Sequence, residues 1–329
     1  MERIILLRKW ANEGDVNYMR ELAFALRHGH GTEKNLPEAF KWYLKAATFG
    51  DSESILAVAE MFREGLGTPV DTTKAVACYK KVFNDRRAHI CDRRIAASRI
   101  AEICEQTNDG AQALLWLKQL NFLGKVEARF KIAEIFRDGC GNVQPDGERA
   151  IACLKEILDD ETLQQVERCS AAFELGKIFH AGTAVERDDE TAIKFFTLAT
   201  EADILLSRDA NLAIAEIYFD EADVGNALKF LSVASDAGSR KATWLLAEIY
   251  RDGKFGVEQN SERALAVLEK VAAEKFDVLN KVIALRKSAE IFSKGLGVPV
   301  DKKRADELYR EASALNKEWF TALNNLQSL

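Results

Sequence analysis

One four-residue phrase recurs along the whole chain, and it limits the possible folds more than any other feature. The phrase begins with a small residue, which we term the first anchor, and most copies read AE followed by two larger apolar residues. Its eight copies start at Ala23, Ala59, Ala101, Ala133, Gly176, Ala215, Ala247 and Ala289. These starts run from residue 23 to residue 289 in seven intervals, so their mean spacing is 38 residues. A period in this range indicates an array of helix pairs.

A second motif follows each first anchor. It consists of an alanine, the second anchor, with two large side chains three and four residues later, which places all three on one face of a helix. The second anchors are Ala39, Ala75, Ala113, Ala150, Ala192, Ala227, Ala264 and Ala305. A small residue lets a neighbouring helix approach closely, and the large pair fills the space beside it. Each copy therefore predicts a helix A that packs against a helix B.

The segment between the two anchors is long in six copies and short in two. In the six, the anchors are 16 or 17 residues apart and glycines such as Gly65 and Gly67 are expected to end helix A. The aspartates expected to cap the start of helix B are Asp71, Asp146, Asp301 and either Asp188 or Asp189. In the third and sixth copies the spacing is 12 residues, and Asn108–Gly110 and Asp223–Gly225 predict a minimal turn.

Two segments carry a family resemblance. The stretches AVAEMFREGLGTPVDTTKAVACYKKV (residues 57–82) and KSAEIFSKGLGVPVDKKRADELYREA (residues 287–312) resemble the Sel1-like repeat (SLR), a relative of the tetratricopeptide repeat. The resemblance extends over about residues 15–317, although the third and sixth copies lack the GxG motif. It implies an all-α fold, a right-handed α/α superhelical solenoid of about eight helix pairs.

The two ends of the chain are expected to cap this array. Residues 1–14 predict an N-terminal capping helix equivalent to half a repeat, residues 15–317 the eight repeats, and residues 318–329 a C-terminal capping helix. Terminal units of a solenoid must cover an otherwise exposed apolar face. If they cover it incompletely, the terminal helices could instead mediate self-association.

Polar residues recur on helix A beside the core positions. Glutamate commonly stands one residue after the first anchor and arginine four residues after it, which places both on one helix face. By the resemblance to tetratricopeptide-type arrays, these two rows and the residue three before the anchor line a concave groove. The predicted partner-binding groove comprises Arg20, Arg27, Glu60, Arg63, Phe130, Glu134, Arg137, Phe173, Leu212, Glu216, Trp244, Glu248 and Arg251. In the alternative interpretation, the charged residues pair between adjacent helices A and the aromatic residues pack between repeats.

No motif in the chain predicts catalysis, a cofactor or a metal. The glycine loops match neither GxGxxG nor GxxxxGK[ST], and they follow helix C-termini, whose partial negative charge disfavours anions. His28 and His30 have no evident third ligand nearby, so loop polarity explains them better than metal binding. The six cysteines show neither CxxC nor a zinc spacing and are expected to be reduced, mostly buried thiols. We therefore expect a protein that is not an enzyme and binds neither cofactor nor metal.

Composition narrows the class of partner. The chain has 46 Lys and Arg against 52 Asp and Glu, a net charge of −6, which disfavours nucleic-acid binding. No stretch approaches the roughly 20 apolar residues that cross a bilayer. We expect a cytoplasmic protein without membrane insertion.

The resemblance points to protein binding. It implies a non-catalytic interaction scaffold or adaptor that binds a peptide or protein partner on the concave helix-A surface. The alternative is a cognate inhibitor or immunity protein that binds and blocks a toxin or enzyme. The acidic charge balance permits a basic target without selecting one.

Overall fold

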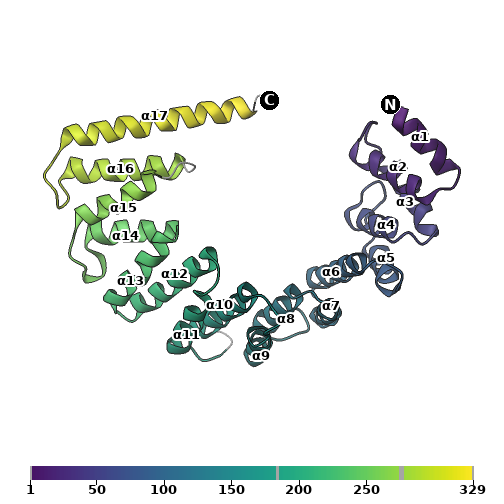
Figure 1. The fold of residues 1–329 in the computed structure, drawn as a ribbon, viewed down its shortest axis with the longest axis horizontal. Coiled ribbons are helices and arrows are strands. Elements are labelled where there is room, and N and C mark those ends of the chain that lie inside the picture. The colour runs from purple at the N-terminus through teal and green to yellow at the C-terminus, as the bar shows by residue number, and fades with distance from the viewer. Residues whose placement is uncertain (1, 183–184, 274–277, 328–329) are drawn as a thin grey trace. The chain divides into compact units, whose positions relative to one another are not determined.

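The computed structural model describes the backbone of residues 2–182, 185–273 and 278–327, and side chains within these ranges up to Lys317. Its contacts divide the chain into two compact units, Met1–Leu154 and Lys155–Leu329. In both units the described residues form helices joined by loops, without strands (Figure 1). This confirms the all-α helical-repeat fold expected from the sequence.

Unit 1 is built from the first nine helices, of which α9 continues into unit 2. Their bounds are α1 Glu2–Asn12, α2 Val16–His28, α3 Leu36–Thr48, α4 Ser52–Glu64, α5 Thr72–Asn84, α6 Ile90–Gln106, α7 Gly110–Phe122, α8 Glu127–Asp138 and α9 Gly147–Leu158. From α1 to α8, each helix packs against the next one in the chain, and α4 also packs against α6. The even-numbered helices are therefore helices A, and the odd-numbered helices are helices B.

Unit 2 continues the same order. Its helices are α10 Gln165–Ala181, α11 Asp189–Ala199, α12 Ile204–Asp220, α13 Val224–Asp236, α14 Arg240–Asp252, α15 Ser261–Ala273, α16 Val278–Lys294 and α17 Lys302–Gln327, with a short 3-10 turn at Lys254–Gly256. Residues 318–327 continue α17 without a break and do not form the separate capping helix expected from the sequence. No helix among the described residues is long and apolar enough to span a membrane.

The anchors form the core, as the sequence predicts. Every alanine among the first anchors, and every second anchor, is at most 3% exposed. The one glycine anchor, Gly176, is explained by its neighbour, because a Cβ atom there would lie 2.7 Å from the ring of Phe196 on the paired helix B. In this repeat the ring of Phe196 therefore takes the space that the Cβ of an alanine anchor would need.

The predicted helix caps are also present. Each of four aspartate side chains accepts a hydrogen bond from the backbone N–H three residues later: Asp71, Asp146, Asp188 and Asp301. At the end of helix A, Gly65 has a φ of +71° and takes the left-handed conformation, where it donates its N–H to the carbonyl of Met61. Gly67 is required for space as well, since a Cβ atom there would lie 2.3 Å from the carbonyl oxygen of Leu36.

In the short turns of the third and sixth copies, a residue other than glycine takes the left-handed conformation. Asn108 and Ala222 both adopt a φ of +61° between helix A and helix B. In unit 1, the loop that follows α8 folds back onto this turn, and Gly141 pairs with Asp109 through an isolated β-bridge. The loop of the fourth repeat thus covers the turn where the third repeat lacks a loop of its own.

Candidate functional site

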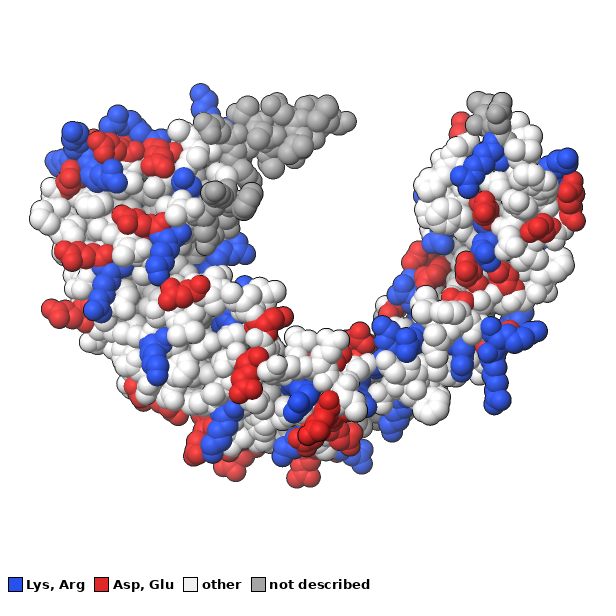
Figure 2. Space-filling model, in the orientation of Figure 1, with Lys and Arg blue, Asp and Glu red and all other residues white. Residues whose placement is uncertain are grey.

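The predicted groove residues lie on the helices A of the two units. In unit 1 they lie on α2, α4 and α8, and in unit 2 on α10, α12 and α14. Glu134 is exposed and the other twelve are half-buried, whereas the anchors beside them are buried. The repeat register therefore separates the buried anchors of each helix A from the partly exposed groove positions, which we call the surface row. On the face shown in Figure 2, acidic and basic side chains intermingle over both units.

In unit 1, Glu60 is the centre of a charged cluster. Its carboxylate lies 2.6 Å from the guanidinium of Arg63 on the same helix, and 2.8 Å from that of Arg99 on α6. Arg99 in turn lies 2.8 Å from Glu102. Burial alone would raise the pKa of Glu60, but the hydrogen bond from Arg63 and the charge of Arg99 hold it below its usual value. The cluster therefore keeps Glu60 ionised and joins two helices A.

In unit 2, lysines connect neighbouring helices A. Lys241 on α14 forms an ion pair with Glu216 on α12. Lys287 on α16 lies 3.7 Å from the carboxylate of Glu248, and its ammonium group lies 5.7 Å from the ring centroid of Trp244. An ammonium group near an aromatic ring is attracted by the ring's negative face. These cations link α12 to α14 and α14 to α16 on the side that carries the surface row.

The arginines of the predicted groove pair differently from expectation. Arg63 forms an ion pair with the glutamate that precedes it by one turn, whereas Arg137 and Arg251 pair with the adjacent aspartates Asp138 and Asp252. Cations outside the predicted rows make the links between helices instead: Arg99 and Lys287, two residues before the anchor, and Lys241, six before it. Sequence reasoning missed these three residues. Their signal was a basic residue one or two helical turns before the glutamate of the same helix.

The apolar members of the predicted groove belong partly to the core of unit 2. The rings of Phe173 and Phe196 lie 5.4 Å apart, and Phe173 packs against a buried cluster that includes Phe196. Leu212 and Trp244 likewise pack against buried clusters of the following repeats. Each of the three still has a partly exposed side chain. This packing agrees with the alternative interpretation of these side chains.

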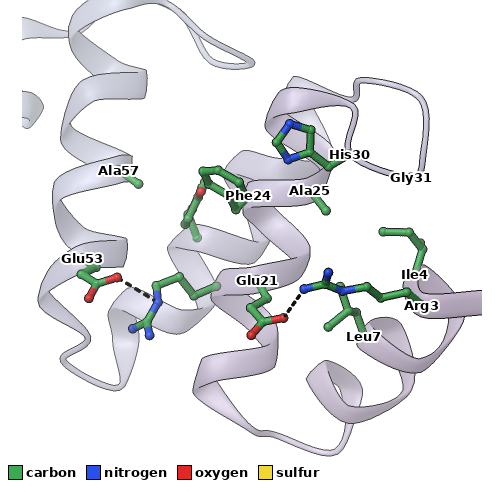
Figure 3. Close-up of a pocket in the computed structure, with 12 residues that line it drawn as sticks. Arg3, Ile4, Leu7, Glu21, Phe24, Ala25, His30, Gly31, Glu53 and Ala57 are labelled. Carbon is green, nitrogen blue, oxygen red and sulfur yellow. Dashed lines mark hydrogen bonds and ion pairs between the residues drawn. The ribbon is translucent and has the colours of Figure 1, made fainter.

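Unit 1 contains a hollow of about 650 Å³ on its helix-A surface (Figure 3). Figure 3 shows Phe24 and Ala25 on α2 between Glu53 and Ala57 of α4 on one side and residues of α1 on the other. The full lining is Arg3, Ile4, Leu7, Arg20, Glu21, Phe24, Ala25, His30, Gly31, Tyr43, Glu53 and Ala57. Arg20 belongs to the predicted groove, and Phe24 stands where most copies carry glutamate. The hollow therefore coincides with the surface row at the first repeat.

Both arginines that line the hollow form ion pairs with acidic side chains of the chain itself. Arg20 pairs with Asp51 and lies 3.1 Å from the carboxylate of Glu53. Arg3 lies 3.4 Å from the carboxylate of Glu21. Phe24 between them has 48% of its surface exposed. The hollow thus combines an open aromatic side chain with charged walls.

Within the described ranges, no three His, Cys, Asp or Glu side chains come close enough together to hold a metal ion. The rings of His28 and His30 lie 5.6 Å apart, and both lie near the Phe24 ring, at 4.3 Å in a tilted and 5.5 Å in an edge-on arrangement between ring centroids. No cysteine in the described part of the chain forms a disulfide, but the expectation of mostly buried thiols is wrong, because Cys169 is buried, Cys91 is exposed and the others are half-buried.

A family model, the Sel1 repeat, matches six segments: residues 17–51, 52–81, 126–157, 169–204, 240–273 and 282–317. Together these segments cover more than half of the chain. The chain belongs to the Sel1 repeat family. The matched segments leave out α6 with α7 and α12 with α13, the two helix pairs that lack the glycine loop. Proteins of this family are generally helical-repeat scaffolds for protein interaction and not catalysts.

Solved structures of similar proteins include other Sel1 repeat proteins. One from Oxalobacter formigenes is 23% identical, with a TM-score of 0.46 over 98% of this chain and 80% of its own. A protective antigen of uropathogenic Escherichia coli that displays an SLR fold is 20% identical, with a TM-score of 0.44 over 94% of this chain and 71% of its own. An immunity protein from Pseudomonas aeruginosa is 18% identical, with a TM-score of 0.33 over 69% of this chain and 81% of its own.

Proposed function

We propose that this Sel1 repeat protein is a non-catalytic scaffold that binds a protein or peptide partner on the helix-A surface of its repeats. The observation that carries the proposal is the hollow over α1 to α4. It lies on the surface row that the repeat register marks, and the chain's own side chains do not fill it. Solenoids present such continuous surfaces to extended partners.

The character of this surface supports a macromolecular partner. The hollow is lined by both apolar and charged side chains, with Phe24 open to solvent between ion pairs. Aromatic and arginine side chains contribute most of the affinity at protein interfaces, while charged pairs around them set orientation. The predicted groove residues Glu134, Glu216 and Glu248 extend a polar row along later helices A of each unit.

Site-specific photo-crosslinking tests which face binds. A benzophenone amino acid is placed at Phe24 on α2 and at Lys241 on α14, both on helices A. Matched controls carry it at Leu44 on α3 and Val233 on α13, which are 45% exposed and lie on helices B. After irradiation in a lysate of the native host, we expect discrete cross-linked bands from the helix-A positions and none from the helix-B positions. Cross-links from helices B alone contradict the proposal.

Mass spectrometry of the cross-linked bands also separates the two functional classes. Several partners from one assembly support a scaffold. A single stoichiometric partner whose toxic or enzymatic activity is lost on binding supports the cognate inhibitor instead.

A further inference from the structure

The first two repeats share the residue type at two of four equivalent positions around one point of the helix-A surface and differ at the other two. In the second repeat, Glu60 stands one residue after the first anchor and Arg63 four after it. Tyr79 stands four residues after the second anchor, and Arg99 two before the next first anchor. The equivalent residues of the first repeat are Phe24, Arg27, Tyr43 and Ala57. The first repeat thus keeps an arginine and a tyrosine but lacks the glutamate and the second arginine.

In the second repeat the side chains at these positions lie against one another. The Glu60 carboxylate lies between the guanidinium groups of Arg63 and Arg99. The Tyr79 hydroxyl is buried beside this cluster, near enough to Glu60 to help lower its pKa, but no hydrogen bond in the structure satisfies it. The site is therefore closed, and a carboxylate of the chain itself neutralises the arginine.

In the first repeat Phe24, Tyr43 and Ala57 line the hollow. Arg27 lies outside this lining, one turn after Phe24 on α2, and its charge acts on the Tyr43 hydroxyl. Among the described residues, Arg27 forms no ion pair and no hydrogen bond, because Phe24 replaces the glutamate one turn earlier. The hydroxyl of Tyr43 in this lining also has no hydrogen-bond partner. Burial raises the pKa of Tyr43 to about 12, so its hydroxyl remains a proton donor at neutral pH. The two arginines that line the hollow are already paired, Arg20 with Asp51 and Glu53 and Arg3 with Glu21.

We propose that the hollow of the first repeat binds an aspartate or glutamate side chain of the partner, whose carboxylate takes the position that Glu60 occupies in the second repeat. The carboxylate accepts hydrogen bonds from the Arg27 guanidinium and the Tyr43 hydroxyl, and an apolar residue beside it packs on Phe24. This inference rests on the proposed function and names the chemistry of the partner.

The surrounding charges favour a carboxylate over a phosphate. Glu21 and Glu53 line the same hollow, and their negative charges oppose a ligand of charge about −2 more strongly than one of −1. A carboxylate is also the group that the chain itself uses at the equivalent point of the second repeat. Charge-assisted hydrogen bonds from arginine to carboxylate are among the stronger polar contacts in proteins.

The test is a peptide titration of the full chain. The probes are two mixtures of short peptides, blocked at both ends, with random apolar residues around a central glutamate or around a central glutamine. Binding is followed by the NMR signal of the Arg27 Nε–H group. We expect the glutamate mixture to bind about tenfold more tightly and to shift this signal, since the glutamine mixture lacks the charged acceptor. Equal binding of the two mixtures, or no shift at Arg27, overturns the proposal.

Two pairs of variants make the result specific. Phe24→Glu supplies an internal carboxylate at the position of Glu60, so we expect it to abolish the preference for glutamate peptides, whereas Phe24→Gln retains it. We expect Arg27→Gln to remove the preference for glutamate peptides. Arg63→Gln should leave it unchanged, because Arg63 is already paired with Glu60 of the same chain. A Phe24→Gln variant that loses the preference as completely as Phe24→Glu shows that only apolar contact matters and overturns the carboxylate site.

Two further arms separate alternative outcomes. A peptide with a free C-terminus and central glutamine, or with a phosphotyrosine, that binds more tightly than the glutamate mixture overturns the choice of an acidic side chain. A positive titration combined with photo-crosslinks only from helices B leaves this site valid and refutes the wider proposed function. Cross-links from helices A without a glutamate preference give the reverse result.

Discussion

The guanidinium of Arg99 on α6 lies 2.8 Å from the carboxylate of Glu60 on α4, so an ion pair joins two successive helices A. The Glu60 side chain is only 17% exposed and also receives Arg63. An ion pair of this kind stabilises more than the same pair at the open surface, because solvent screens it less.

Replacing Glu60 is expected to make stability depend less on pH. The pKa of Glu60 is lowered in the folded chain, so its contribution is fully present above its unfolded pKa of about 4.5 and is lost as the pH falls through the lower folded value. Thermal unfolding of the parent and of Glu60→Gln should therefore differ most at neutral pH and converge once the pH lies below the lowered pKa of folded Glu60. A difference that grows on acidification contradicts this assignment.

Removing Arg99 should cost more stability than removing an exposed partner. We expect Arg99→Ala to lower the free energy of unfolding by about 1 kcal/mol, since Glu60 keeps only Arg63. Lys270→Ala is the control, because its pair with Asp236 has side chains 66% and 59% exposed. That change should lie within about 0.5 kcal/mol of zero by urea denaturation. Equal effects of the two substitutions would show that the link between α4 and α6 adds nothing.

Tyr79→Phe should leave stability unchanged or raise it. The Tyr79 hydroxyl is buried without a hydrogen bond, so its removal relieves a desolvation penalty that is on the order of 1 kcal/mol. Tyr43→Phe is the matched control. Tyr43 lines the hollow, so removal of its hydroxyl should change the free energy of unfolding by about zero. A clear loss of stability in Tyr79→Phe alone would reveal a hydrogen bond from that hydroxyl to the Glu60 cluster.

Gly67→Ala should be more harmful than Gly50→Ala. Both glycines have positive φ values, +72° and +84°, so both alanines carry a backbone penalty of about 1 kcal/mol. A Cβ atom at Gly67 would additionally lie 2.3 Å from the carbonyl oxygen of Leu36. At Gly50, no atom beyond the two neighbouring residues lies within 4 Å of a Cβ atom. We expect a further loss of about 1–3 kcal/mol for Gly67→Ala, measured by calorimetry. Similar melting temperatures would mean that the loop moves away without cost.

Gly176→Ala should destabilise unit 2, although alanine occupies this position in the other repeats. The added methyl group meets the Phe196 ring at 2.7 Å, and overpacking of this kind costs about 1–3 kcal/mol. Phe196→Leu in the same chain should recover part of the loss, because Leu231 accompanies Ala215 at the equivalent positions. If the double variant is as unstable as the sum of the single variants, the two residues are not coupled.

The sequence by itself determined the helix pairs, their anchors and their caps. The pattern around Ala59 and the pattern around Ala75 each place the small residue on the apolar face of its own helix. The carboxylate of Asp71 accepts a hydrogen bond from the backbone N–H three residues later. These features depend on contacts within one or two turns of a helix, so periodicity and residue type suffice to predict them. The choice of Asp188 over Asp189 as the cap needed the structure, because adjacent aspartates offer the same chemistry.

Only the tertiary structure decided which charges meet and where the surface stays open. Arg99 reaches Glu60 and Lys287 reaches Glu248 because packing sets the rotation and spacing of successive helices A, which no local pattern encodes. The same holds for Phe24, whose replacement of a glutamate is visible in the sequence, while the hollow beside it exists only once α1, α2 and α4 are packed. Side-chain partners across helices depend on distances of a few ångströms, and the repeat register fixes only the faces.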